Sequence, residues 1–298
     1  MKKSAAVYTV SDQDVHEGST AAVGRVGRLD LDYVRREGRT VLAHSSCTTP
    51  WHFLPPIELE NERAAYTLLV NPSGGLVGGD HLTIHARVGD GAHALFSTPS
   101  ANRVYRSSVG TARQTMRLEV GSDARAEWVP EPAIPYAGSR YAQSFEITVA
   151  RGGVLWFWET LASGRMARGE RWAFTEFSSD IRITAADGRR MVERMRVEAG
   201  RANRGVGLAS EWDYVASAFL VADQVGESVL ADIHDEAALA FDSFGSELLG
   251  GVSHPAAPGL AIKLMAKSGD GLRAAQDRIW EVVRRRLWNR GLPPLRKY

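Results

Sequence analysis

The chain has 298 residues, of which 44% are hydrophobic and 24% charged, a composition typical of globular proteins that excludes wholesale disorder. Its 36 Lys and Arg balance 35 Asp and Glu to a formal net charge of +1, so we expect neither nucleic acid nor a membrane as a partner. The single cysteine, Cys47, excludes an internal disulfide and fits a reducing compartment, which predicts a cytoplasmic protein.

The first two thirds of the chain predict a flexible arm followed by β-structure. Residues 1–22 have no clear periodicity, and we expect them to form a flexible N-terminal arm. Residues 23–205 show a hydrophobic period of two, as in 82–88, with Gly, Asp and Asn clusters between the apolar runs. This pattern predicts many short strands, and without a fixed sequence repeat the strands cannot be assigned to a simple solenoid.

A glycine-rich run precedes one of these strands. Gly74, Gly75, Gly78 and Gly79 resemble a dinucleotide-binding loop, but such a loop must open a helix, and here an alternating strand follows. We therefore interpret the four glycines as a sharp backbone turn beside Asp80.

The last third of the chain, residues 206–298, predicts an α/β part of one domain that spans 23–298. We expect strands at 214–222 and 259–267 and a helix over 227–249. A final amphipathic helix is expected to be capped by Asp270 and to stop at Gly291. Its last turn carries Arg284, Arg285 and Arg286, which we expect on the exposed side of the helix.

Strand alternation directs three carboxylates, Asp80, Glu159 and Glu193, toward the protein interior, on the faces that also carry the apolar residues of their strands. A buried ionised carboxylate costs several kcal/mol unless it is paired, hydrated or bound to a cation. Two interpretations stay open from the residues alone. The acids could form separate ion pairs with nearby arginines, or they could line an internal path for a divalent cation. The arginines available for such pairs are Arg103, Arg165 and Arg168.

Several blocks of the sequence, in this order, resemble the UreD (also called UreH) family of urease accessory proteins. The blocks are Asn71-Pro72-Ser73-Gly74-Gly75-Leu76-Val77-Gly78-Gly79-Asp80-His81-Leu82, Ser97-Thr98-Pro99-Ser100-Ala101-Asn102-Arg103-Val104-Tyr105-Arg106, Glu127-Trp128-Val129-Pro130-Glu131-Pro132-Ala133-Ile134, Trp158-Glu159-Thr160-Leu161 with Gly164-Arg165 and Gly169-Glu170, and Val192-Glu193-Arg194.

This resemblance implies a fold and a function. The fold is mainly β, an irregular helical wrap of many short strands (β-helix-like) with α-helices in the C-terminal third. The function is a non-enzymatic scaffold, or metallochaperone, for nickel insertion into apo-urease, in a complex with a UreF-type accessory protein and a UreG-type GTPase. The resemblance implies transient nickel(II) and no tightly bound cofactor. It places nickel contacts at Asp80, Glu159 and Glu193, and Glu131 and Glu170 are weaker candidates.

Two other functional hypotheses remain. The chain could be a purely structural interaction module whose inward acids are all paired with arginine, or a hydrolase that uses Asp80 and Glu159 as an acid–base pair. Trp280 and Trp288 on the last helix could anchor a partner surface or pack in the core.

Overall fold

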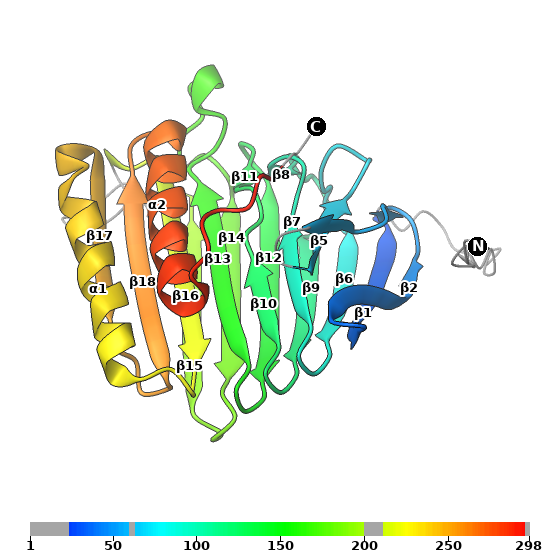
Figure 1. The fold of residues 1–298 in the computed structure, drawn as a ribbon. Helices are drawn as coiled ribbons and strands as arrows, with labels where there is room; N and C mark the ends of the chain where they lie inside the picture. Colours follow the sequence, from blue (N-terminus) through cyan, green and yellow to red (C-terminus); the bar gives the residue numbers. More distant parts are fainter. Residues whose placement is uncertain (1–23, 60–62, 200–210, 296–298) are drawn as a thin grey trace.

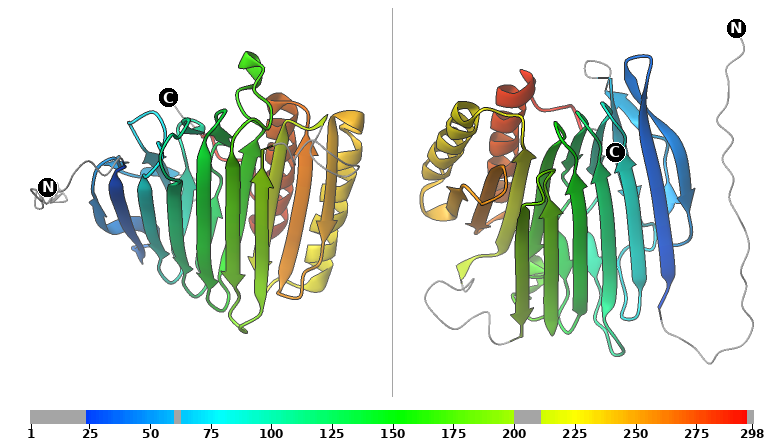
Figure 2. Two further views of the ribbon diagram at one scale, coloured as in Figure 1. Left: turned by 180° about the vertical axis from the view of Figure 1, so that it is seen from behind. Right: turned by 90° about the horizontal axis from the view of Figure 1, so that it is seen from below.

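The computed structural model describes residues 24–59, 63–199 and 211–295, so the arm expected at residues 1–22 lies outside the described residues. Two β-sheets face each other, and two α-helices cover the outer face of the second sheet (Figures 1 and 2). The mainly β, helically wrapped fold is confirmed, because successive strands alternate between the two sheets as the chain advances.

The first sheet has seven strands in the order β15-β14-β12-β9-β6-β1-β2. The five inner strands run parallel, and each edge strand is antiparallel to its neighbour. The strands span β1 Val26–Arg36, β2 Arg39–Cys47, β6 His81–Val88, β9 Ala112–Val120, β12 Arg140–Val149, β14 Glu176–Thr184 and β15 Arg190–Glu198.

The second sheet has eleven strands, with the main path β17-β18-β16-β13-β10-β7-β5-β3. Strand β4 pairs with β5, and the short strands β8 and β11 pair with each other beside β13. The strands span β3 His52–Phe53, β4 Ile57–Leu59, β5 Ala64–Val70, β7 His93–Ser97, β8 Asn102–Val104, β10 Arg125–Trp128, β11 Ala133–Pro135, β13 Val154–Ala162, β16 Tyr214–Ala222, β17 Leu248–Ser253 and β18 Gly259–Ala266.

The core between the sheets consists of stacked columns of apolar side chains. One column runs across the first sheet through buried register partners on five adjacent strands, namely Leu29, Ile84, Met116, Phe145 and Ile181. The alternating runs of the sequence are therefore consecutive turns of one wrap. The chain between successive column positions varies in length, which explains why no fixed repeat is visible in the sequence.

The two helices, α1 Glu227–Asp242 and α2 Gly269–Trp288, form the third layer. Trp156 and Trp158 of β13 belong to the same buried cluster as Ile233 of α1 and Ile279 of α2. Strand β13 is therefore covered on both faces, by the first sheet and by the helices. In the part of the chain that the structure describes, no helix is long and apolar enough to cross a membrane.

The structure corrects three expectations for the C-terminal third. The helix expected over 227–249 ends at Asp242, and Leu248–Ser253 instead forms β17, because these residues pair with β18 at the sheet edge. The N-cap of α2 is Ser268 rather than Asp270, since the Ser268 side chain accepts a hydrogen bond from Gly271 N at 3.1 Å. The helix stops at Asn289 rather than Gly291, because asparagine tolerates the left-handed conformation observed there.

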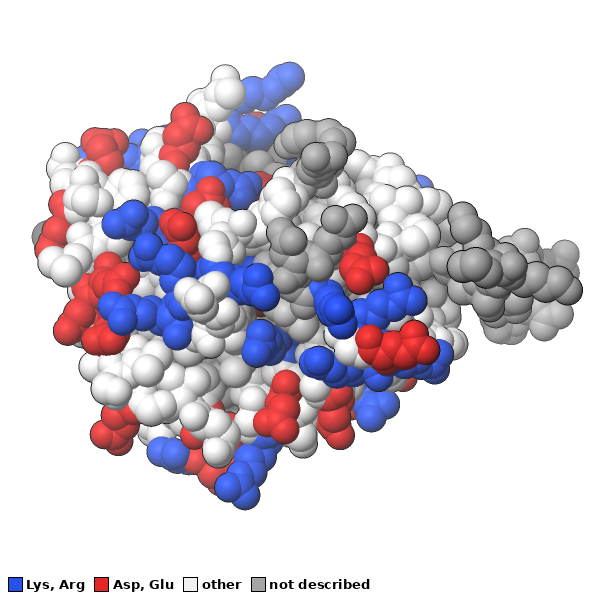
Figure 3. Space-filling view, in the orientation of Figure 1, with Lys and Arg blue, Asp and Glu red and all other residues white. Residues whose placement is uncertain are grey.

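The exposed side of α2 is ion-paired with α1. Arg285 and Arg286 both contact Glu236, and Arg286 also contacts Asp232. Basic and acidic side chains are interspersed over this face of the molecule (Figure 3), as the near-zero net charge predicts. Arg284 is an exception to the expected exposure, because it is fully buried.

Candidate functional site

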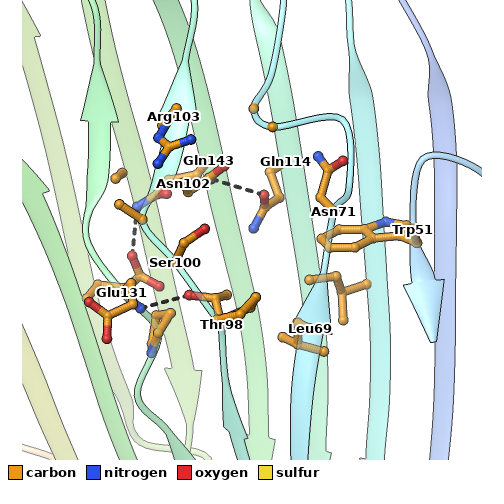
Figure 4. A pocket seen from close by; sticks show the side chains of 18 of the residues that line it. Trp51, Leu69, Asn71, Thr98, Ser100, Asn102, Arg103, Gln114, Glu131 and Gln143 are labelled. Carbon is orange, nitrogen blue, oxygen red and sulfur yellow. Dashed lines mark hydrogen bonds between the residues drawn. The ribbon is translucent and has the colours of Figure 1, made fainter. Parts of the chain in front are cut away.

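A pocket of about 80 Å³ lies between the two sheets, beside the ends of β7 and β10 (Figure 4). This volume holds a few water molecules. Uncharged polar side chains make up much of the wall, namely Asn71, Thr98, Ser100, Asn102, Gln114 and Gln143. Among the described residues that line it, Glu131 and Glu159 supply carboxylates and Arg103 a guanidinium group. The wall is therefore rich in oxygen atoms that could contact a cation.

Four of the sequence blocks that carry the family resemblance meet at this pocket. Asn71, Gly74 and Gly75 come from the first block, 98–103 from the second, 128–133 from the third and Glu159 from the fourth. These segments are distant in the sequence but become neighbours because the wrap stacks one turn of chain on the next.

The glycine run forms a turn beside Asp80, as expected, and Gly74 and Gly75 also line one side of the pocket. A Cβ atom on Gly75 would lie 2.5 Å from the carbonyl oxygen of Arg103, so the close approach of these two chain segments requires glycine. Gly79 has φ +91°, a conformation that favours glycine. The turn thereby brings Leu76 into backbone hydrogen bonds with 103–105.

Glu159 points from β13 into the pocket and is surrounded by uncharged donors. Trp128 Nε1 donates to its Oε1 at 2.8 Å, and Gln143 Nε2 approaches its Oε2 at 3.4 Å. Burial raises the pKa of Glu159 to about 7, and the two hydrogen bonds offset only part of this effect. The carboxyl group therefore exchanges a proton near neutral pH, and the inward direction inferred from strand alternation is confirmed.

Asp80 is more deeply buried than Glu159, with 2% of its surface exposed, and it has a different environment. Its Oδ1 accepts a hydrogen bond from Arg25 N and its Oδ2 one from Val77 N, each at 2.8 Å. The side chain thus closes the glycine turn and does not line the pocket of Glu159. Asp80 and Glu159 do not form the paired-acid cleft that the hydrolase hypothesis needs. A contact between Asp80 and nickel stays a prediction.

Glu193 lies on β15 and points toward the second sheet, on the same face as Met191. Ser217 Oγ of β16 donates to its Oε1 at 2.8 Å, and the Lys263 ammonium of β18 contacts its Oε2. The partner of Glu193 is therefore a lysine rather than one of the arginines considered from the sequence.

The two weaker candidates are each paired with an arginine. Glu131 at the pocket contacts Arg273 of α2. Glu170 accepts hydrogen bonds from Arg165, which lower the pKa of this carboxyl group. Arg165, one of the arginines considered as partners of the three inward acids, is therefore paired with Glu170 instead.

A polar row connects Glu159 to Glu193. Ser217 is the direct cross-strand partner of Glu159 on one side and of Lys263 on the other. Directly opposed residues of an antiparallel pair lie on the same face of the sheet, with Cα atoms about 5 Å apart. Because Ser217 also bonds Glu193 of the facing sheet, polar side chains lead from Glu159 at the pocket to Glu193.

One buried carboxylate escaped the sequence analysis. Glu127 of β10 is fully buried on the opposite face of the second sheet. Trp280 Nε1 donates to its Oε2 at 2.6 Å, while Arg284 Nη1 and His93 Nε2 contact its Oε1 at 2.5 Å and 2.7 Å. The signal available in the sequence was the shared parity of Glu127 with the apolar Val129.

The contacts of Glu127 also explain why Arg284 and Trp280 are buried. Burial by itself would raise the pKa of Glu127, but the hydrogen bonds and charges of His93 and Arg284 outweigh burial and lower it. Arg284 is buried because it is the counter-ion of this carboxylate. Trp280, with 3% of its surface exposed, packs in the core rather than on a partner surface.

Within the described ranges, no three His, Cys, Asp or Glu side chains come together as a site that could hold a metal ion. The carboxylates near the pocket instead occur singly, each with neutral donors or one cationic partner.

Comparison with known proteins finds matches to one family over most of the chain. The family model described as "UreD urease accessory protein" matches residues 25–297. "Urease accessory protein UreD 2" of Streptomyces griseus is 34% identical over 281 residues, covering 92% of this chain and 94% of the relative. "Urease accessory protein UreD" of Deinococcus radiodurans is 36% identical, covering 69% and 75%. The Haloarcula marismortui protein of that name is 28% identical, covering 95% and 94%.

Proposed function

The chain belongs to the UreD family of urease accessory proteins, and we propose that it passes nickel to apo-urease as a cytoplasmic, non-enzymatic scaffold. In this proposal it works in a complex with a UreF-type protein and a UreG-type GTPase. The observation that carries the proposal is the pocket between the sheets, where four family blocks surround Glu159 and a polar row leads on to Glu193.

The environment of Glu159 suits a cation that must be released again. A carboxyl group with a pKa of about 7 can exchange its proton for a divalent cation near neutral pH. Its neighbours Gln143 and Trp128 are uncharged, so a Ni²⁺ bound at Glu159 would meet no cationic competitor among the hydrogen-bond partners of this carboxylate. Glu131 of the same pocket is paired with Arg273, and the amide and hydroxyl oxygens that remain are weak ligands for nickel, which favours transfer over storage.

The row from Glu159 through Ser217 to Glu193 supplies the next contact. Each member is a hydrogen-bonding neighbour or a cross-strand partner of another, so an ion could change ligands without entering apolar surroundings. We propose that Glu159 and Glu193 are successive transient contacts. Asp80 supports the path by closing the glycine turn, because both of its oxygens are already hydrogen-bonded to backbone amides.

The test is urease activation with variants of the two acids. Apo-urease, the accessory proteins and this chain carrying Glu159→Ala or Glu193→Ala are co-expressed, and nickel per active site is measured alongside pull-down of the partners. We expect both variants to join the complex and to lower nickel loading. Glu146→Ala is the control, because Glu146 is an exposed glutamate whose partner is Arg117.

A purely structural role is the second candidate, favoured by the ion pairs of Glu131, Glu170 and Glu193. If the acids only hold the fold, their removal should weaken assembly of the complex, because Glu159→Ala removes the acceptor of Trp128 and Glu193→Ala removes the acceptor of Ser217. Full nickel loading by both alanine variants in an intact complex would exclude the proposed path.

A further inference from the structure

Lys263 lies beside Glu193, at the end of the polar row. Its ammonium contacts Glu193 Oε2 and donates to Ser217 Oγ at 2.9 Å, while Ser217 in turn donates to Glu193 Oε1. Glu193 is largely buried, with 11% of its side chain exposed, whereas 57% of the Lys263 side chain is exposed. The lysine therefore reaches from solvent onto the carboxylate that ends the row.

The ammonium occupies the place that a cation would take at Glu193. A divalent ion that arrives from Glu159 along Ser217 needs the same carboxylate oxygen and the same hydroxyl oxygen. Lysine is a compact point charge on a flexible stem, so it can leave this position without moving the backbone. Because its side chain is already more than half exposed, the released ammonium would be solvated at once.

We infer that Lys263 is an internal competitor for nickel that keeps Glu193 occupied until a divalent cation displaces it. This inference rests on the proposed function and adds a residue to it. The competition lowers the affinity of Glu193 for nickel, which keeps the ion from being trapped at the last carboxylate. It also prevents an unpaired carboxylate from remaining between the sheets when no nickel is present.

The first experiment measures nickel binding by the full chain in equilibrium dialysis at pH 8. Lys263→Met keeps the length of the side chain and removes its charge, so nickel should bind about threefold to fivefold more tightly, as expected for loss of a half-exposed ion pair. The double variant Lys263→Met/Glu193→Gln should lose this gain. Lys267→Met is the control, because it removes the same charge from a lysine that contacts Glu247 instead.

The second experiment uses the unmodified chain and an amine-reactive reagent read by mass spectrometry. Addition of Ni²⁺ should increase labelling of Lys263 and leave labelling of Lys267 unchanged.

Unchanged affinity in Lys263→Met together with unchanged labelling would overturn the competitor role. If the wild-type chain binds nickel but Glu159→Gln does not, while Lys263→Met has no effect, only the inference about Lys263 fails. Absence of nickel binding that depends on Glu159 or Glu193 would remove the proposed function as well.

Discussion

Glu127 and Glu159 lie on the neighbouring strands β10 and β13 but face opposite sides of the second sheet. Glu127 points toward α2, where Arg284, His93 and Trp280 contact its oxygens. Glu159 points toward the first sheet and meets the uncharged donors Trp128 and Gln143.

The two carboxylates show that burial does not decide the role of an acid. Burial opposes ionisation of both, yet the pKa of Glu127 is lowered and that of Glu159 is raised to about 7. The difference comes from the charge of the surrounding groups. A carboxylate beside a buried guanidinium is committed to holding the fold, whereas one beside neutral donors can release and regain a proton or a cation.

The largest expected effect comes from breaking the buried pair at Glu127. Arg284→Met should lower the free energy of unfolding by about 3–5 kcal/mol, because it removes the buried guanidinium that pairs with Glu127 and leaves this carboxylate with His93 and Trp280. Thermal or denaturant unfolding of the full chain measures the change. Arg285→Met is the matched control, since that arginine is exposed and its pair with Glu236 is worth about 1 kcal/mol or less.

The double variant Glu127→Met/Arg284→Met separates pairing from packing. If the loss in Arg284→Met comes from the stranded charge, the double variant should recover much of the stability. A double variant that is less stable than Arg284→Met would show instead that the guanidinium acts mainly through its contacts with 280–291.

The second largest effect is a pH dependence at Glu159. A glutamate ionises near pH 4.5 in the unfolded chain and at about 7 here, so between these values the folded state keeps a proton that the unfolded state has lost. Stability should therefore fall as pH rises from about 4.5 to about 7 and then level off. The total loss is about 3 kcal/mol. Glu159→Gln should lack this slope.

Melting temperatures of the wild-type chain and of Glu159→Gln, measured from pH 5 to pH 8, test this expectation. The two curves should diverge with rising pH, and the variant should be the more stable protein at pH 8. Parallel curves would mean that Glu159 is ionised over the whole pH range and that its pKa is not raised in the folded chain.

How far the sequence predicts these sites depends on where their partners come from. The inward direction of Asp80, Glu159 and Glu193 followed from alternation along single strands, which is a local property. The role of Glu127 could not be derived in this way, because its partner Arg284 lies 157 residues away on α2. The same distance explains why Arg284 was expected on the exposed side.

The fold shows the same division between local and distant information. The strand at 214–222 was predicted with its observed bounds, since a strongly apolar run marks it. Strand β17 was not predicted, and the expected helix over 227–249 ran into its first residues, because Leu248–Ser253 becomes a strand only through pairing with β18. The resemblance to a family predicted the wrap of strands. A search for a sequence repeat could not find it, because the turns of the wrap differ in length.

A smaller effect is expected at Asp80, the third buried carboxylate. Both oxygens accept backbone amide hydrogens, so Asp80→Asn would turn a donor toward one of these amides. The cost should be about 1–3 kcal/mol, the penalty of one unsatisfied buried group. In the control Asp90→Asn, the bond from Ser122 N is exposed and water can replace it. Equal melting temperatures for Asp80→Asn and the wild type would show that the turn does not need the carboxylate.

The smallest effect should come from replacing Gln143, because this residue donates a hydrogen bond to Glu159. Gln143→Met keeps the length of the side chain but removes the amide that donates to Glu159. Because that bond favours the ionised form, its loss should raise the pKa of Glu159 further. This contact is long, at 3.4 Å, but the same amide also donates to Ser179 Oγ at 3.2 Å, so the cost in stability should be about 1 kcal/mol. The fall of stability with pH should then end at a higher pH than in the wild type.

Gln114→Met is the control, because Gln114 lines the same pocket and bonds Asn102 instead. A shift of equal size in both variants would assign the effect to the polarity of the pocket rather than to the donor at Glu159.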